Sequence, residues 1–183
     1  MSANGAFSNR FARKKQWKLD PGLCKAIEHF HEPDQSIVDI GAGVGKYVEW
    51  MRQDLGADVF GVDGIEGVEE LSEGLVEHMD LTATIAFNPP YDSAICIEVA
   101  EHIHHRDIPT FLRNVNQLVN GRLLWSAAVV GQRGRAHVSC HMPEWWSARI
   151  CDMTGWSLNE EQTLEVRNLA GKGWDRKLMV FER

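Results

Sequence analysis

A short apolar segment that ends in three closely spaced glycines constrains this chain more than any other part of its sequence. The segment, residues 36–40, is rich in β-branched side chains and predicts a buried strand. It leads into Gly41, Gly43 and Gly45, and helical spacing of apolar residues follows over residues 45–55. Glycines at such a turn let backbone N–H groups approach a ligand without interference from a Cβ atom. A P-loop is excluded because Lys46 is followed by Tyr47, and the third glycine departs from the dinucleotide-binding spacing GxGxxG.

The rest of the chain alternates between strand-like and helical segments. Strands are predicted over residues 36–40, 58–62, 75–79, 93–99 and 122–130, and helices over residues 21–31, 45–55, 68–71, 108–119 and 143–153. Strands without a polar face are typical of a parallel sheet covered by helices on both sides. Two more strand-like segments, near residues 158–166 and 177–182, are separated by a short gap that contains glycine. This gap predicts a hairpin and one antiparallel strand near an edge of the sheet.

The charge of the chain is unevenly distributed. The 183 residues fit one domain, which we assign to residues 21–183, after a basic N-terminal arm of residues 1–20. Residues 1–18 hold five of the 19 lysines and arginines and no acid, so 14 bases face 26 acids in the remainder, a net charge of −12. Such an acidic domain argues against broad affinity for nucleic-acid backbone, and we interpret the arm as a solvated leader or lid.

Acidic residues stand at the ends of four successive predicted strands. Asp39 lies in the first strand, and Asp63, Asp80 and Glu98 end the second, third and fourth. The carboxyl ends of parallel strands meet at one edge of a sheet, where open α/β folds bind their ligands. An acid in the position of Asp63 can accept hydrogen bonds from both hydroxyls of an adenosine ribose.

Together these features resemble the class I S-adenosylmethionine-dependent methyltransferases. The matching elements, in order over residues 36–130, are Asp39-x-Gly41-x-Gly43-x-Gly45, Asp63, Asp80-Leu81 and the run from Tyr91 to Ile103. The resemblance implies a Rossmann-like, doubly wound α/β sheet, mostly parallel with one antiparallel strand near the edge. It also implies that S-adenosylmethionine is the cofactor.

The resemblance further assigns parts of the cofactor to individual residues. It implies that Asp39 and the loop of Gly41, Gly43 and Gly45 hold the methionine part, and that Asp63 holds the ribose. Asp80 and Leu81 would contact the adenine, and Glu98 would lie near the reacting end.

The run Glu98-x-x-Glu101-His102 supplies candidate catalytic groups. Together with His137 from a later loop, Glu101 and His102 are our predicted catalytic residues, because an imidazole can accept a proton near neutral pH. The run also resembles the metal-binding cluster of ubiquinone-pathway O-methyltransferases and small-RNA terminal 2′-O-methyltransferases. That resemblance implies a divalent ion such as Mg²⁺, with His137 or His141 as a further ligand. We favour the interpretation without metal, in which Glu101 and His102 cap the following helix.

Asn88-Pro89-Pro90-Tyr91 resembles a motif that contacts the target amine in adenine amino-methyltransferases. In that family the motif follows the fourth strand, whereas here it precedes the strand. We therefore interpret the two prolines as a rigid turn that leads into the strand.

These observations predict a methyltransferase that moves a methyl group from S-adenosylmethionine to an oxygen or nitrogen atom of a small molecule. The four cysteines lack a CxxC pair, and no signal peptide or membrane-spanning stretch is evident, so we expect a cytoplasmic protein. Neither nucleic acid nor membrane is an expected partner, and the sequence does not determine the oligomeric state. Two alternatives stay open. One is metal-assisted RNA 2′-O-methylation, favoured by the Glu-x-x-Glu-His run and the basic arm. The other is a non-catalytic, cofactor-binding partner subunit.

Overall fold

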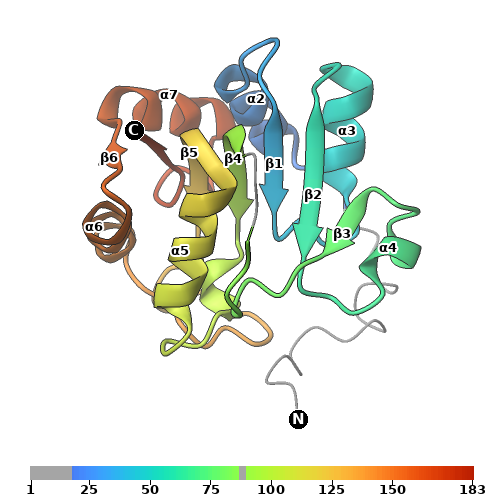
Figure 1. Ribbon diagram of the computed structural model, residues 1–183. Coiled ribbons are helices and arrows are strands. Elements are labelled where there is room, and N and C mark those ends of the chain that lie inside the picture. The colour runs from blue at the N-terminus through green and yellow to red at the C-terminus, as the bar shows by residue number, and fades with distance from the viewer. Residues whose placement is uncertain (1–17, 87–89) are drawn as a thin grey trace.

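A seven-stranded sheet forms the middle layer of the protein in the computed structural model, which describes residues 18–86 and 90–183. The strand order is β3-β2-β1-β4-β5-β7-β6 (Figure 1). The strands are β1 (Ile37–Ile40), β2 (Val59–Asp63), β3 (Val76–His78), β4 (Tyr91–Ile97), β5 (Val119–Ser126), β6 (Ser157–Leu158) and β7 (Met179–Glu182). Strands β1 to β5 are parallel, and β7 runs antiparallel to both β5 and β6. The predicted fold class is confirmed. Residues 1–17 of the arm, and Asn88 and Pro89 of the lead-in turn, lie outside the described residues.

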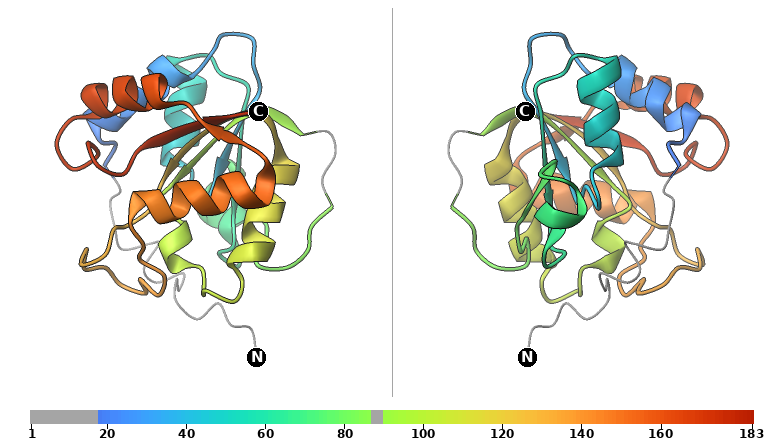
Figure 2. Two further views of the ribbon diagram at one scale, coloured as in Figure 1. Left: turned by 90° about the vertical axis from the view of Figure 1, so that its left-hand side faces the viewer. Right: turned by 90° about the vertical axis from the view of Figure 1, so that its right-hand side faces the viewer.

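Helices cover both faces of the sheet (Figure 2). One face carries α2 (Pro21–Phe30), α3 (Lys46–Asp54) and α7 (Glu160–Ala170), and the other carries α5 (Ile108–Leu118) and α6 (Pro143–Thr154). The short helices α4 (Val68–Leu71) and η1 (Ala100–His102) follow β2 and β4. Neighbouring residues of β1 enter opposite cores, since Ile37 packs with the first group of helices and Val38 with the second. A strand buried on both faces has no polar side, which explains why β1 is apolar except for Asp39.

The segment around residues 158–166 is not the predicted strand. Only Ser157–Leu158 is extended, and α7 follows directly. Asn159 caps this helix, because its side chain accepts a hydrogen bond from the Gln162 N–H at 3.0 Å. Val166 and Ala170, spaced at four residues, are buried in the core shared with α2. The antiparallel pairing of β6 and β7 is present, but a helix joins them, so the predicted hairpin is wrong.

Strand β5 is also displaced from its predicted position. It begins at Val119, directly after α5, and ends at Ser126, whereas residues 127–130 belong to the following loop. This boundary puts Ser126 at the carboxyl edge of the sheet, beside the end of β4. In the described part of the chain, no helix combines the length and apolar character needed to cross a bilayer.

Candidate active site

The glycine turn lies at the carboxyl end of β1, the edge to which the arrowheads of β1 and β2 point (Figure 1). Gly41 has a φ of 79°, and a Cβ atom there would lie 2.3 Å from the side chain of Val99, so the turn packs tightly against the segment after β4. Gly43 has a φ of 58°, and a Cβ atom there would meet nothing within 4 Å. The outer side of the turn is therefore open, which fits a ligand cradle.

Asp63 connects the end of β2 to this turn. Its Oδ2 atom accepts a hydrogen bond from the Gly43 N–H at 2.7 Å, and its Oδ1 atom accepts one from the Ile65 N–H at 3.0 Å. Burial raises the pKa of this carboxyl group, although the N–H groups of Gly43 and Ile65 act in the opposite direction. Each carboxylate oxygen has two acceptor sites, so the group retains capacity for two ribose hydroxyls.

The other predicted cofactor residues occupy the same edge in different environments. Asp39 is 5% exposed, and burial, followed by the charge of Asp63, raises its pKa to about 8. Asp80 follows β3, and its Oδ1 atom accepts hydrogen bonds from the N–H and the hydroxyl of Thr82 at 2.9 and 2.6 Å. The side chain of Leu81 is buried in the core that the sheet shares with α5.

Glu98 directly follows β4 and has a left-handed backbone conformation, with a φ of 56°. Its Oε2 atom accepts hydrogen bonds from Lys177 at 2.7 Å and Gln132 at 3.1 Å, and its Oε1 atom accepts one from the Ser126 hydroxyl at 3.0 Å. The Lys177 ammonium lies 4.5 Å from the ring centroid of Trp174.

Lys177 was not predicted as a site residue. It lies two residues before the start of β7, whose amino end adjoins the carboxyl end of β5 because the two strands are antiparallel. That position in the chain was the one signal that could have placed Lys177 at this edge.

Glu101, His102 and His137 come together as a compact cluster. One potential ligand atom from each residue lies within 4.8 Å of the others. Glu101 and His102 belong to η1, and His137 belongs to the loop between β5 and α6. The backbone holds the two segments together, since the Glu101 carbonyl oxygen accepts hydrogen bonds from the N–H groups of Val138 at 2.8 Å and Ser139 at 3.0 Å. The three predicted catalytic residues are thus neighbours.

Backbone carbonyls orient both imidazole rings. The Nδ1 atom of His102 lies 3.1 Å from the Ala136 carbonyl oxygen, and that of His137 lies 3.2 Å from the Gln132 carbonyl oxygen. A carbonyl only accepts, so these contacts assign the proton to Nδ1 and leave each Nε2 with a lone pair. Burial lowers the pKa of His102, which favours its neutral form.

Glu101 is the least solvated member of the cluster. It is 0% exposed, and neither carboxylate oxygen has a hydrogen-bond partner of normal geometry. Its Oε1 atom lies 3.9 Å from the His137 Nε2 atom. Burial and the nearby charge of Glu98 raise its pKa to about 7, and the adjacent N–H of Ala128 only partly offsets them. A buried carboxyl group that lacks a well-formed hydrogen bond and lies beside two imidazole rings fits a divalent cation.

The remaining candidate ligands lie outside this cluster. Among the described residues, neither Glu98 nor His141 belongs to the group that could share an ion. The ring of His141 stacks on Trp145, with centroids 3.7 Å apart and planes inclined by 12°. Of the two histidines predicted as a further ligand, His137 is the one that joins the cluster.

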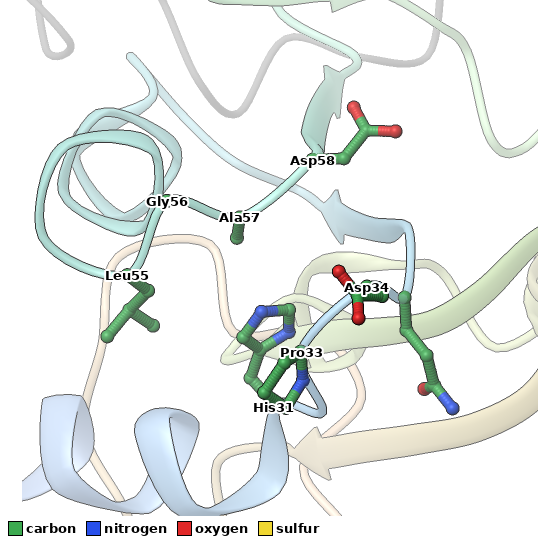
Figure 3. A pocket seen from close by; sticks show the side chains of 8 residues that line it. His31, Pro33, Asp34, Leu55, Gly56, Ala57 and Asp58 are labelled. Carbon is green, nitrogen blue, oxygen red and sulfur yellow. The ribbon is translucent and has the colours of Figure 1, made fainter.

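Two hollows of the surface are separate from these residues. A cavity of about 310 Å³ lies beside the amino ends of β1 and β2, at the opposite edge of the sheet (Figure 3). Its lining consists of His31, Pro33, Asp34, Gln35, Leu55, Gly56, Ala57 and Asp58. A groove of about 540 Å³ lies between α6 and α7. None of the predicted site residues lines either hollow.

Sequence comparison identifies a family for this chain. The family described as "Methyltransferase domain" matches residues 11–168, which is most of the sequence. No curated protein matches the chain significantly.

Solved structures with the same fold include several methyltransferases. Magnesium protoporphyrin IX methyltransferase from Synechocystis PCC 6803, with bound S-adenosylhomocysteine, has a TM-score of 0.62 and 19% identity over 87% of this chain and 78% of that one. The 1,6-didemethyltoxoflavin-N1-methyltransferase of Burkholderia thailandensis has a TM-score of 0.59 and 18% identity over 89% and 76%. Phosphoethanolamine N-methyltransferase 1 of Haemonchus contortus has a TM-score of 0.63 and 13% identity over 90% and 42%. Structural similarity at such low sequence identity shows that these proteins share a fold with this chain.

Proposed function

Because the chain belongs to the methyltransferase domain family, we propose that it transfers a methyl group from S-adenosylmethionine to an oxygen or nitrogen atom of a small molecule. The observation that carries this proposal is the division of the carboxyl edge into two parts. The open glycine turn and Asp63 lie at the ends of β1 and β2, and the Glu101, His102 and His137 cluster lies beyond the ends of β4 and β5. Cofactor and acceptor therefore have separate binding regions at one edge.

The residues of the first region suit the cofactor. The open side of Gly43 gives a ligand access to the backbone, and Asp63 offers its remaining acceptor sites to a ribose. The three similar structures described above all contain S-adenosylhomocysteine, the product of the same cofactor. When bound, S-adenosylmethionine supplies a methyl group that is already activated on a positively charged sulfur. What the protein must add is alignment of the acceptor, exclusion of water and, for a hydroxyl acceptor, removal of a proton.

The second region suits proton removal. The Nε2 atoms of His102 and His137 each have a lone pair, because a backbone carbonyl holds the proton on Nδ1. A proton taken up at Nε2 of His137 would lie beside the Glu101 carboxyl group, whose negative form stabilises the resulting imidazolium. We propose His102 and His137 as the candidate general bases and Glu101 as the group that supports them.

The same three side chains favour a second form of this activity, in which a divalent cation assists. Two imidazole nitrogens and one carboxylate would hold the ion, and the Ala136 and Gln132 carbonyls already orient the rings as outer partners of metal ligands do. A bound divalent ion lowers the pKa of a hydroxyl that it contacts. Glu98, which the motif resemblance includes among the ligands, is instead held by Lys177, Gln132 and Ser126.

Cofactor binding is tested by calorimetric titration with S-adenosylhomocysteine. We expect micromolar affinity, about −8 kcal/mol. Asp63→Ala should weaken it by about 1–3 kcal/mol, because charge-assisted hydrogen bonds to the ribose are lost. Asp58→Ala, at the other end of β2, is the matched control and should bind like the wild type. If the Asp63 and Asp58 variants bind S-adenosylhomocysteine equally well, the proposal that Asp63 binds the ribose is wrong.

Acceptor and metal are tested together in a methyl-transfer screen. Chelator-treated protein is assayed for release of S-adenosylhomocysteine with hydroxylated and amino small molecules, and with short RNA, before and after addition of Mg²⁺ or Mn²⁺. If the cluster holds a metal, the chelator abolishes transfer, the ion restores it, and His137→Gln prevents the recovery. Transfer that is insensitive to chelator identifies the metal-free form. Transfer to RNA alone, weakening steeply with salt, would replace the small-molecule proposal. Cofactor binding without transfer to any acceptor would identify a partner subunit.

A further inference from the structure

Glu98 joins three segments that are far apart in the sequence. It directly follows β4, whereas Ser126 ends β5, Gln132 lies in the loop after β5, and Lys177 lies in the loop before β7. All three partners donate to its two carboxylate oxygens, over distances of 2.7 to 3.1 Å. We call these four residues the Glu98 clamp.

The clamp continues to the proposed catalytic cluster through Gln132. The side chain of Gln132 donates to Glu98, and its own carbonyl oxygen lies 3.2 Å from the Nδ1 atom of His137. The Sγ atom of Cys140 also lies 3.7 Å from this Nδ1 atom, but the carbonyl contact is the shorter of the two. A displacement of Gln132 therefore moves the acceptor that favours the proton on Nδ1 of His137. Gly134, two residues on, adds to this dependence, because a Cβ atom there would lie 2.0 Å from His137 Nε2, so the loop fits closely against the imidazole ring.

Lys177 supplies the charge that this arrangement requires. Its side chain is 11% exposed and that of Glu98 is 24% exposed, so both charged groups have lost most of their contact with water. The ion pair between them compensates for this loss. The ring of Trp174 confines the ammonium from another side. Without a cation at this position, the carboxylate of Glu98 would be left with two neutral donors and would turn toward water.

We infer that Lys177 is a positioning residue for His137, acting through Glu98 and Gln132. The inference rests on the proposed participation of His137 in methyl transfer. What it predicts physically is the tautomer and the orientation of the His137 imidazole ring. The orientation of His137 in the cluster therefore depends on the loop before β7. This loop contributes none of the three residues of the cluster.

The test observes the imidazole directly. Long-range proton–nitrogen spectra of the chelator-treated, ¹⁵N-histidine-labelled full chain distinguish protonated from unprotonated ring nitrogens, and His137→Gln assigns the His137 signals. In the wild type we expect His137 to show a protonated Nδ1 and an unprotonated Nε2. In Lys177→Met, which keeps the aliphatic stem beside Trp174, we expect the two nitrogen shifts to converge as the fixed tautomer is lost. Lys177→Arg, which restores the cation, should recover the wild-type pattern.

Two further variants complete the design. Lys172→Met removes an exposed lysine from the same loop and should leave the His137 signals unchanged. Gln132→Ala leaves the Lys177–Glu98 pair in place but removes the side-chain link, and should reproduce the change seen in Lys177→Met. It also serves as the decisive variant if Lys177→Met does not fold.

Three results would overturn the inference: native His137 signals in Lys177→Met, native signals in Gln132→Ala, or an equal loss in Lys172→Met. Titration of the wild type with S-adenosylhomocysteine separates this outcome from failure of the proposed function. A protein that does not bind the product, yet shows the expected tautomer changes, would retain the clamp and lose the proposed methyl transfer.

Discussion

At the scale of single residues, the carboxyl group of Asp39 makes the stability of the fold depend on pH. Burial raises its pKa to about 8 in the folded protein, from an ordinary value of 3.8. Between these values the folded state binds more protons than the unfolded state, so the free energy of unfolding falls as the pH rises. One such group contributes a slope of up to about 1.4 kcal/mol per pH unit.

Asp39→Asn should remove this contribution, because the amide does not ionise. Urea unfolding between pH 5 and pH 8 should show the stability of the wild type falling relative to that of the variant as the pH rises. Asp58→Asn, an exposed aspartate, should follow the wild type across the range. A difference between the wild type and Asp39→Asn that does not change with pH would show that Asp39 keeps its ordinary pKa in the folded state.

Single residues also show where sequence reasoning succeeds and where it stops. Glu101 and His102 are adjacent in the sequence, and a histidine from the loop after β5 could be expected near them because β4 and β5 end at the same edge. The contact between Lys177 and Glu98 spans 79 residues and leaves no local pattern. Only the antiparallel direction of β7, once known, brings the lysine to that edge.

At the scale of elements, α7 shows how an exposed apolar residue can make a helix resemble a strand in its pattern of apolar residues. Leu164 and Val166 alternate as in a strand, yet Leu164 is 61% exposed and lines the groove beside α6, whereas Val166 is buried. The informative signal was the cap, Asn159 before two glutamates, together with Gly171 after the last turn. The central strands β1, β2 and β4, in contrast, could be placed from sequence because burial on both faces makes most of their residues apolar.

The contribution of the Asn159 cap of α7 to the free energy of unfolding can be measured. Asn159→Ala should lower the free energy of unfolding by about 1 kcal/mol, because the Gln162 N–H loses its acceptor and the Glu182 carboxylate loses the Asn159 amide donor. Asn168→Ala, at an exposed position of the same helix, should change it by less than about 0.5 kcal/mol. Urea denaturation of both variants measures the difference. Equal effects would mean that the Asn159 side chain contributes nothing specific to the start of the helix.

At the scale of the whole molecule, the two outer strands of the sheet limit how copies of the protein can associate. Strand β3 has three residues and β6 has two, and Glu77 and His78 of β3 are exposed. Each edge strand therefore offers few unpaired N–H and C=O groups with which a strand from another chain could form hydrogen bonds. The sheet is a poor template for its own extension, so self-association would have to proceed through helices and loops.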